Sequence, residues 1–280
     1  MVSMIALSGA ELLDFAVLVD APAPPFGRDD SGGSIPSLPD LLYVAWFALV
    51  GPVIDFLTFW PRFHRWSRID PARAQRLLRA WTIGPAWALV TVGAVLWMTS
   101  GRSWRSFGLS LPEGWRLWTS IGLVMLVAAY ELLVVATVAR SAEAKASVRQ
   151  QSEAFTAVLP RTRSALSWFG AVSLTAGFCE EFLFRGYFIR IFSTWLGWWG
   201  AAALSLLFFA GGHAYQGWSG ILRTGIVGAI FTITVAIFDS LWPAIALHAL
   251  HDLGGGVVAW LALRDEPAEP SSAVETAPGS

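Results

Sequence analysis

The chain has 280 residues, of which 55% are hydrophobic and only 14% are charged. Such a small number of charged side chains cannot keep this much apolar surface soluble, which excludes an ordinary soluble protein. The composition therefore predicts an integral membrane protein that is surrounded by the lipid bilayer. The formal net charge of -1 supplies no long-range attraction to nucleic acid and argues against a nucleic-acid partner. The single cysteine, Cys179, excludes an intrachain disulfide and a cysteine metal cluster.

Both ends of the chain are expected to lie outside the membrane domain. Residues 1–40 form an N-terminal interfacial and loop segment in this prediction. Residues 1–20 lack a basic start and carry interrupting acids, so we expect an interfacial helix and not a cleaved signal peptide, while residues 21–40 are rich in Pro, Gly, Ser and Asp. The acidic segment 265–280 is typical of a disordered tail.

Residues 41–264 are expected to form one all-α, polytopic bundle of about seven transmembrane helices. A helix needs roughly 20 mostly apolar residues to span the hydrocarbon core. Stretches that qualify or nearly qualify lie at 41–60, 80–99, 116–139, 165–190, 196–214, 220–238 and 242–263. Tryptophans at their ends, such as Trp97, Trp198 and Trp242, are typical of an aromatic belt at the headgroups.

Basic residues predict the orientation of the bundle. The segment between the first two stretches is rich in arginine, and the positive-inside rule places it in the cytoplasm together with the basic segment 140–164. The N-terminus then lies outside and the C-terminus in the cytoplasm. Within the first basic segment, Asp70 followed by Pro71 predicts the start of a short amphipathic helix on the membrane surface. The arginine-rich, lysine-poor composition favours the cytoplasmic (inner) membrane of a bacterium.

Ionisable side chains within apolar helices are costly, and each needs a partner or a function. The second half of the chain concentrates them. They are Glu180, Glu181, Arg185, His213, His248, His251 and Asp252.

Helical spacing sorts these groups. Arg185 follows Glu181 by four residues and can pair with it on one face, which leaves the adjacent Glu180 without a partner on its own helix. His248 and Asp252 are also four apart, so we expect the carboxylate to fix the tautomer and direction of the imidazole. His251 is expected to be a bystander.

Depth along the helices brings Glu180 and His213 together. Glu180 lies 16 residues before Leu196 and His213 lies 17 residues after it. If a hairpin is centred at Leu196, both side chains lie roughly 25 Å from it at about 1.5 Å per residue. His248 lies only a few residues into its helix and fits less well, so meeting the others requires a tilt, a re-entrant segment or a kink at Gly211 and Gly212.

Three motifs in these helices resemble those of the CAAX-protease and bacteriocin-processing family of intramembrane endopeptidases, which includes the type II CAAX prenyl endopeptidase. Glu180 to Gly186 (EEFLFRG) resembles the EExxxR motif of that family. Phe209 to His213 (FAGGH) resembles its FxxxH motif, and His248 to Asp252 (HALHD) resembles its Hxxx(N/D) motif. The three occur in the family's order, and the resemblance covers about residues 100–260.

The resemblance implies a role for each matching position. Glu180 matches the glutamate that activates the attacking water, helped by the histidine that His213 matches. His248 and Asp252 match positions that help to stabilise the tetrahedral oxyanion. The supporting positions of the site are matched by Glu181, Arg185 and Phe209.

Asp252 departs from the family pattern, because many members have Asn there. An ionised carboxylate cannot donate a hydrogen bond to an oxyanion, so Asp252 must be protonated, orient His248 or bind a metal. Glu180, His213, His248 and Asp252 also suit Zn²⁺ in ligand type, although their spacing is not that of an HExxH metalloprotease. We favour metal-independent activation of water, with no cofactor required.

The sequence thus predicts an intramembrane endopeptidase that hydrolyses a peptide bond of a membrane-associated protein or peptide. One alternative is a membrane proton or cation relay or transporter, which uses the same buried groups. It would be expected to show paired broken helices and an internal repeat, and the sequence shows neither. Another alternative is a catalytically silent membrane scaffold or immunity protein that retains the motifs.

Overall fold

The computed structural model describes residues 35–152 and 157–265. The interfacial helix predicted at 1–20, the predicted loop as far as residue 34 and the predicted tail beyond residue 265 lie outside the described residues.

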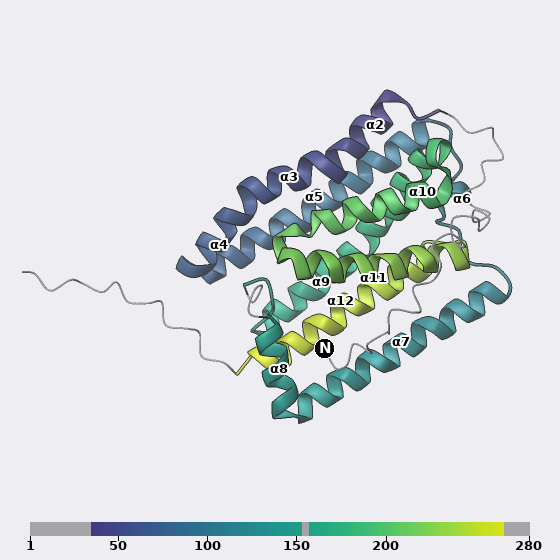
Figure 1. The fold of residues 1–280 in the computed structure, drawn as a ribbon. Helices are drawn as coiled ribbons and strands as arrows, with labels where there is room; N and C mark the ends of the chain where they lie inside the picture. Colours follow the sequence, from purple (N-terminus) through teal and green to yellow (C-terminus); the bar gives the residue numbers. More distant parts are fainter. Residues whose placement is uncertain (1–34, 153–156, 266–280) are drawn as a thin grey trace, which may run out of the picture.

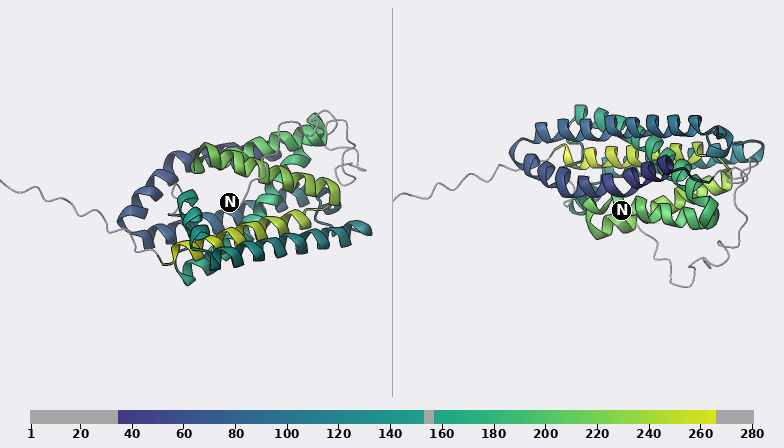
Figure 2. Two further views of the ribbon diagram at one scale, coloured as in Figure 1. Left: turned by 60° about the horizontal axis from the view of Figure 1, so that its bottom comes forward. Right: turned by 90° about the horizontal axis from the view of Figure 1, so that it is seen from above.

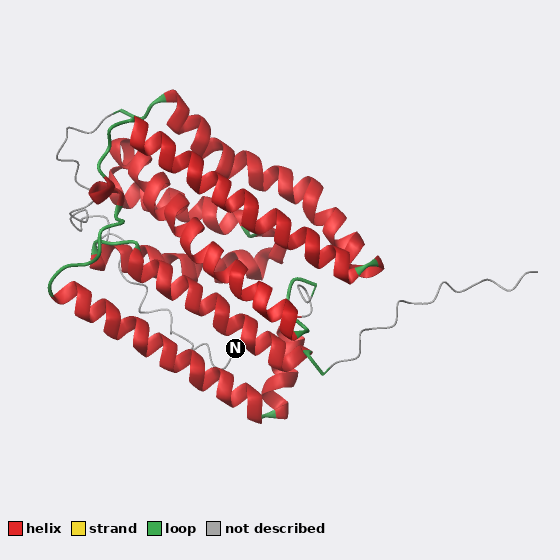
Figure 3. Cartoon of the chain, turned by 180° about the vertical axis from the view of Figure 1, so that it is seen from behind, coloured by secondary structure: helices red, strands yellow, loops and turns green. Residues whose placement is uncertain are grey.

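Helices make up the bundle, and the described residues contain no strand (Figure 1, Figure 3). Among these residues, six helices are long and apolar enough to cross a membrane, namely Leu38–Ile69, Arg73–Thr99, Trp115–Arg140, Arg163–Gly212, Ala214–Phe238 and Trp242–Leu263. The predicted all-α polytopic class is therefore confirmed, whereas the predicted number of about seven is not.

The helical segments are numbered as in Figure 1. In chain order they are α2 (Leu38–Ala45), η2 (Trp46–Val50), α3 (Gly51–Ile54), η3 (Asp55–Phe59), α4 (Trp60–Ile69), α5 (Pro71–Thr99), α6 (Trp104–Phe107), α7 (Trp115–Arg140), α8 (Ala142–Ser152), α9 (Arg163–Glu180), η5 (Glu181–Phe188), α10 (Ile189–Gly212), η6 (Ala214–Gln216), α11 (Gly217–Phe238) and α12 (Trp242–Leu263).

The difference in number lies in the 50-residue stretch Arg163–Gly212, which covers two of the predicted spans. Gly197, inside α10, has φ 65° and ψ 169° and so leaves the helical conformation. Glycine adopts a positive φ readily because it has no Cβ. The chain then folds back, since the Ser205 hydroxyl donates to the Phe184 carbonyl oxygen at 2.8 Å. The hairpin predicted at Leu196 is thus present, displaced by one residue.

Asp70 caps a helix as predicted, but that helix does not end at the membrane surface. The Asp70 carboxylate accepts a hydrogen bond from the Arg73 backbone N–H at 2.9 Å, and a proline occupies the first turn. From there α5 continues without interruption to Thr99. The prediction of a separate surface helix is wrong, because α5 continues through Gly84 and Pro85 into the apolar stretch that follows.

Two tryptophans assigned to the aromatic belt are buried instead. Trp97 is 0% exposed and Trp198 is 4% exposed. The Trp97 indole donates to the Ser103 carbonyl at 3.2 Å and packs edge-on against Phe107. Belt tryptophans with exposed rings include Trp81, Trp115, Trp118, Trp195, Trp218 and Trp242.

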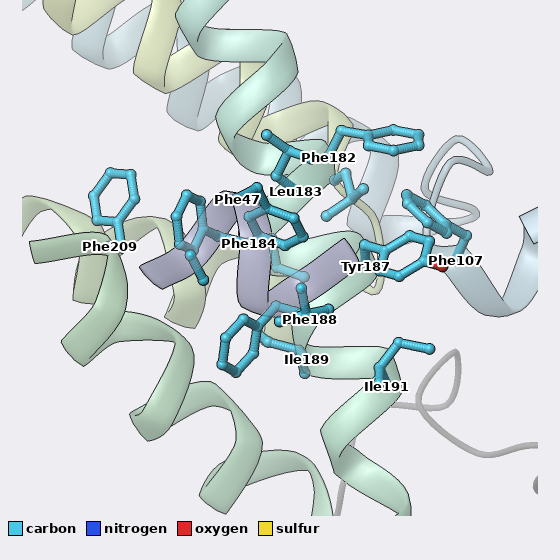
Figure 4. Close-up of a cluster of buried hydrophobic side chains, with 14 of the residues drawn as sticks. Phe47, Phe107, Phe182, Leu183, Phe184, Tyr187, Phe188, Ile189, Ile191 and Phe209 are labelled. Atoms are coloured by element: carbon cyan, nitrogen blue, oxygen red, sulfur yellow. The ribbon is translucent and has the colours of Figure 1, made fainter. Parts of the chain in front are cut away.

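The core encloses η5, in which all eight residues are buried. Figure 4 shows aromatic side chains around this segment. Phe182 packs on Phe107 with 4.5 Å between ring centroids, and Phe184 packs edge-on against Phe47 and Phe209. Because this packing surrounds the segment on several sides, it holds the polar side chains of η5 in fixed positions.

Helix α12 packs against both α9 and α7 (Figure 1, Figure 2). A Cβ added at Gly177 of α9 would lie 2.9 Å from the backbone nitrogen of Ala249 in α12. The missing side chain therefore lets the two backbones approach closely at this level. The close approach brings the end of α9 beside the first turns of α12.

Candidate active site

The adjacent glutamates at the junction of α9 and η5 have different surroundings. Glu181 is fully buried, and its Oε1 accepts hydrogen bonds from Arg185 Nη1 at 3.1 Å and His248 Nδ1 at 2.9 Å. The Glu180 side chain is 30% exposed, and its Oε2 is buried without a hydrogen-bond partner. The structure thus shows the predicted pairing of Glu181 with Arg185 and the predicted lack of a partner for Glu180.

Arg185 joins η5 to α11. Its Nη2 donates to the Gly228 carbonyl at 2.9 Å, and its Nε donates to the Thr232 hydroxyl at 3.3 Å. A Cβ at Gly228 would lie 2.8 Å from Nη2, so glycine leaves the space that the guanidinium occupies. The guanidinium carbon also lies 4.1 Å from the centroid of the Phe209 ring. The predicted supporting residues therefore form a chain of contacts, in which Arg185 binds Glu181 and also packs on Phe209.

His248 is oriented by Glu181 of the neighbouring helix. Its Nε2 lies 3.9 Å from Glu180 Oε2 and 3.7 Å from Asp252 Oδ2, distances beyond hydrogen-bond reach. The expectation that Asp252 fixes the His248 ring is wrong. Nδ1 of His248 donates to Glu181 instead, at the close contact between α9 and α12. His248 reaches the site because the close approach at Gly177 brings α12 beside the end of α9. The helix α10 ends at Gly212, where a kink was predicted.

His213 follows the last residue of α10. Its Nδ1 lies 2.9 Å from the Phe209 carbonyl oxygen. A carbonyl oxygen only accepts, so Nδ1 carries a proton, and in the neutral form of the ring the lone pair is on Nε2. This nitrogen is an acceptor for a water molecule or its proton.

One cavity of about 420 Å³ connects the predicted catalytic residues. Its lining includes Glu180, His213, His248 and Asp252. The cavity extends to the arginine-rich end of the bundle, where Trp60, Gln75 and Arg79 line it. The depth argument that placed Glu180 and His213 together agrees with this shared lining.

The alternative zinc site stays a prediction. Within residues 35–152 and 157–265, no group of three or more His, Cys, Asp or Glu side chains is arranged to hold a metal ion. What the cavity offers instead is a carboxylate oxygen without a partner beside imidazole nitrogens. Such a set can activate a water molecule by general-base catalysis.

Sequence analysis overlooked Glu131, an acid inside the predicted span 116–139. Its Oε1 lies 3.5 Å from Nδ1 of His251, and the absence of a side chain at Gly254 makes room for the carboxylate. His251, expected to be a bystander, also lines the cavity. The signal was present, because an ionisable residue within an apolar helix is the same criterion that singled out Glu180.

Residues 162–254 match the protein family described as Type II CAAX prenyl endopeptidase Rce1-like. This segment runs from the start of α9 into α12 and contains all four predicted catalytic residues. No curated protein and no solved structure matches the chain.

Proposed function

We propose that the chain is an intramembrane endopeptidase, on the premise that residues 162–254 match the Type II CAAX prenyl endopeptidase Rce1-like family. Its reaction is the hydrolysis of a peptide bond of a membrane-associated protein or peptide. The observation that carries the proposal is the Glu180 carboxylate, which has a buried oxygen without a partner in the cavity that it shares with His213 and His248.

Glu180 is the general base in this mechanism. A water molecule in the cavity gives a proton to the Glu180 carboxylate as its oxygen attacks the carbonyl carbon of the substrate. Nε2 of His213, which keeps a lone pair because Nδ1 donates to a carbonyl, helps to hold this water. The C–N bond then breaks, and the proton held by Glu180 passes to the leaving amine.

His248 stabilises the charge that develops on the carbonyl oxygen. Its Nδ1 donates to Glu181, which directs the opposite nitrogen, Nε2, toward Glu180 and Asp252. A doubly protonated ring donates from Nε2 to the oxyanion, while the Glu181 and Asp252 carboxylates on its two sides compensate its charge. Asp252 acts in this way without donating a hydrogen bond itself.

Wild type and Glu180→Gln, purified in detergent and given a library of quenched fluorescent peptides, test the proposal. Loss of the general base is expected to lower cleavage by about 10²- to 10⁴-fold without lowering the melting temperature, because the altered oxygen has no partner to lose. Glu113→Gln is the matched control, since the Glu113 side chain is 79% exposed and far from the cavity lining.

Equal cleavage by wild type and Glu180→Gln would overturn the proposal. A chelator is expected to leave the wild-type rate unchanged. Loss of activity with the chelator, restored by Zn²⁺, would replace general-base catalysis with metal catalysis.

We further propose that the protein lies in the cytoplasmic membrane of a bacterium with its arginine-rich end in the cytoplasm. The support is the positive-inside bias of α4, the start of α5 and the segment 140–164. The substrate then enters the cavity from the cytoplasmic side. A Glu143→Cys variant is expected to react with an impermeant thiol reagent in inverted vesicles only, since the natural Cys179 is buried. Labelling of intact cells would reverse the orientation.

A further inference from the structure

Two arginines line the same cavity as Glu180 but have no role in the proposed chemistry. They are Arg79 of α5 and Arg223 of α11. Within the part of the chain that the structure describes, neither guanidinium forms an ion pair with a carboxylate. Arg79 lies over the Trp168 ring at 5.3 Å, and Arg223 donates to the carbonyl and hydroxyl oxygens of Ser219. The Arg79 side chain is partly buried and the Arg223 side chain is exposed, so both can bind an anionic group of a ligand that enters the cavity.

The spacing of side chains along α9 gives the distance from Arg79 to the Glu180 carboxylate. Residues four apart lie on one face of a helix, and Trp168, Val172, Ala176 and Glu180 form such a row along the cavity wall. Trp168 precedes Glu180 by 12 residues, which corresponds to about 18 Å of α-helix. The Arg79 guanidinium therefore lies at the opposite end of the cavity from Glu180.

Arg223 gives a similar distance from another helix. Its guanidinium turns back along α11 to Ser219, nine residues before Gly228. The Gly228 carbonyl is held by Arg185, which also holds Glu181. Nine residues of helix correspond to about 13 Å, so both arginines lie well away from the reacting bond on the same side of it.

The wall between the two ends is largely apolar. Val172 and Ala176 of α9 and Val227 of α11 line this part. An extended peptide advances about 3.4 Å per residue, so a distance of about 13 to 18 Å corresponds to four or five residues. The cavity thus offers a carboxylate-rich site at one end, an apolar passage, and two guanidinium groups at the other end.

We propose that Arg79 and Arg223 bind a carboxylate of the peptide substrate, about four or five residues from the bond that is cleaved. This deepens the proposed endopeptidase function and rests on it. Guanidinium groups match a carboxylate in shape and charge, and Glu180 and Asp252 repel an anion from the opposite end of the cavity. The two charged ends therefore orient the peptide, and the residues between them are apolar.

Binding measurements test this subsite apart from catalysis. The Glu180→Gln protein, which cannot turn over substrate, is placed in phosphatidylcholine nanodiscs and titrated against a fluorescein-labelled octapeptide with five apolar C-terminal residues. The peptide is used as a free acid, as its C-terminal amide, and as an amide that carries Asp or Asn at the last position. Anisotropy gives each Kd in this background and after addition of Arg79→Gln, Arg223→Gln or Arg76→Gln. Arg76 is the control, because it removes the same charge from the next turn of α5 but does not line the cavity.

The free acid is expected to bind about 10- to 100-fold more tightly than the amide, the range for a charge-assisted hydrogen bond. Arg79→Gln and Arg223→Gln are expected to reduce this preference to less than about threefold, and Arg76→Gln is expected to preserve it. A preference for Asp over Asn, with no preference for the free terminus, would place the carboxylate on a side chain and still support the subsite.

Equal binding of all four peptides would overturn the proposal, as would an equal effect of Arg76→Gln. An arginine substitution could instead weaken binding of the acid and the amide equally, and do so only when phosphatidylglycerol replaces phosphatidylcholine in the nanodiscs. That result would show that the arginines bind a lipid phosphate. If the acid preference depends on Arg79 and Arg223 while wild type cleaves no peptide, the subsite stands and the endopeptidase function fails. If wild type cleaves peptides but binding shows no preference for the acid, the endopeptidase function stands and the subsite fails.

Discussion

Asp40 and Glu180 are both carboxylates within the helical bundle, yet their oxygens have very different partners. Asp40 Oδ1 accepts from Arg102 Nη1 at 2.8 Å and from the Tyr187 hydroxyl at 2.6 Å. Its Oδ2 accepts from Arg102 Nη2 at 2.6 Å and from the Ser37 backbone N–H at 2.8 Å. Glu180 Oε2 is equally enclosed but has no hydrogen-bond partner.

The difference separates a structural carboxylate from a reactive one. The hydrogen bond to Asp40 raises the pKa of the Arg102 guanidinium above its ordinary value, so the pair stays charged. A satisfied buried pair of this kind fixes the position of the elements it joins, here α2, the loop after α5, and η5. A buried oxygen without a partner costs free energy, and its retention indicates a function that a satisfied group would not perform.

The largest effect is expected from Arg185→Gln, because it removes the guanidinium that pairs with the buried Glu181 carboxylate. The pair is completely buried, and removing one partner from such a pair costs about 3–5 kcal/mol in the free energy of unfolding. Cleavage is expected to fall as well, since Glu181 also orients His248. Thermal unfolding in detergent and peptide cleavage measure the two effects.

Arg105→Gln is the control for this variant, because Arg105 and Glu113 form a pair whose side chains are more than 70% exposed. It is expected to change stability by less than about 1 kcal/mol. If Arg185→Gln is as stable as this control, Glu181 does not depend on the arginine.

A smaller effect is expected from Asp40→Asn. The Arg102 side chain is 10% exposed and retains an amide acceptor, so the loss is about 2–3 kcal/mol of stability. Because the change lies outside the cavity lining, cleavage per folded molecule is expected to stay within about twofold of wild type. A selective loss of turnover at full stability would show that Asp40 is not simply structural.

The smallest effect is expected from Tyr187→Phe, which removes one of five hydrogen bonds to the Asp40 carboxylate and leaves the ion pair intact. The ring still packs against Tyr43 at 4.8 Å, so the expected loss is about 1 kcal/mol. Unfolding of this variant, of Asp40→Asn and of the double variant gives the coupling between the two residues. Strictly additive losses would mean that the hydroxyl contributes nothing through Asp40.

Features that depend on one helix, or on two helices joined by one hairpin, could be predicted from the sequence, whereas contacts between helices far apart in the chain could not. Spacing along a helix was enough to pair Glu181 with Arg185, and residue counting placed the hairpin within one residue of Gly197. The hydrogen bond from His248 to Glu181 joins residues 67 positions apart, and no helical period reports it. Asp40 was assigned to a loop because its partner Arg102 is 62 residues away.

The π-helical geometry of η5 was also invisible to pattern analysis, which assumed an α-helix throughout. Such wide turns are rare and are favoured by their surroundings more than by residue type. Here the surroundings are the aromatic side chains from other segments that enclose η5 (Figure 4).

The wide turns of η5 make the number of residues in the motif as important as their identity. In an α-helix each residue rotates the chain by about 100°, so deleting or inserting one residue after Glu181 would direct Arg185 away from Gly228. A copy of EEFLFRG grafted onto a regular helix would keep every side chain and still lose this arrangement. Transplanting the site into another scaffold therefore requires the non-α backbone and the aromatic enclosure along with the seven residues of the motif.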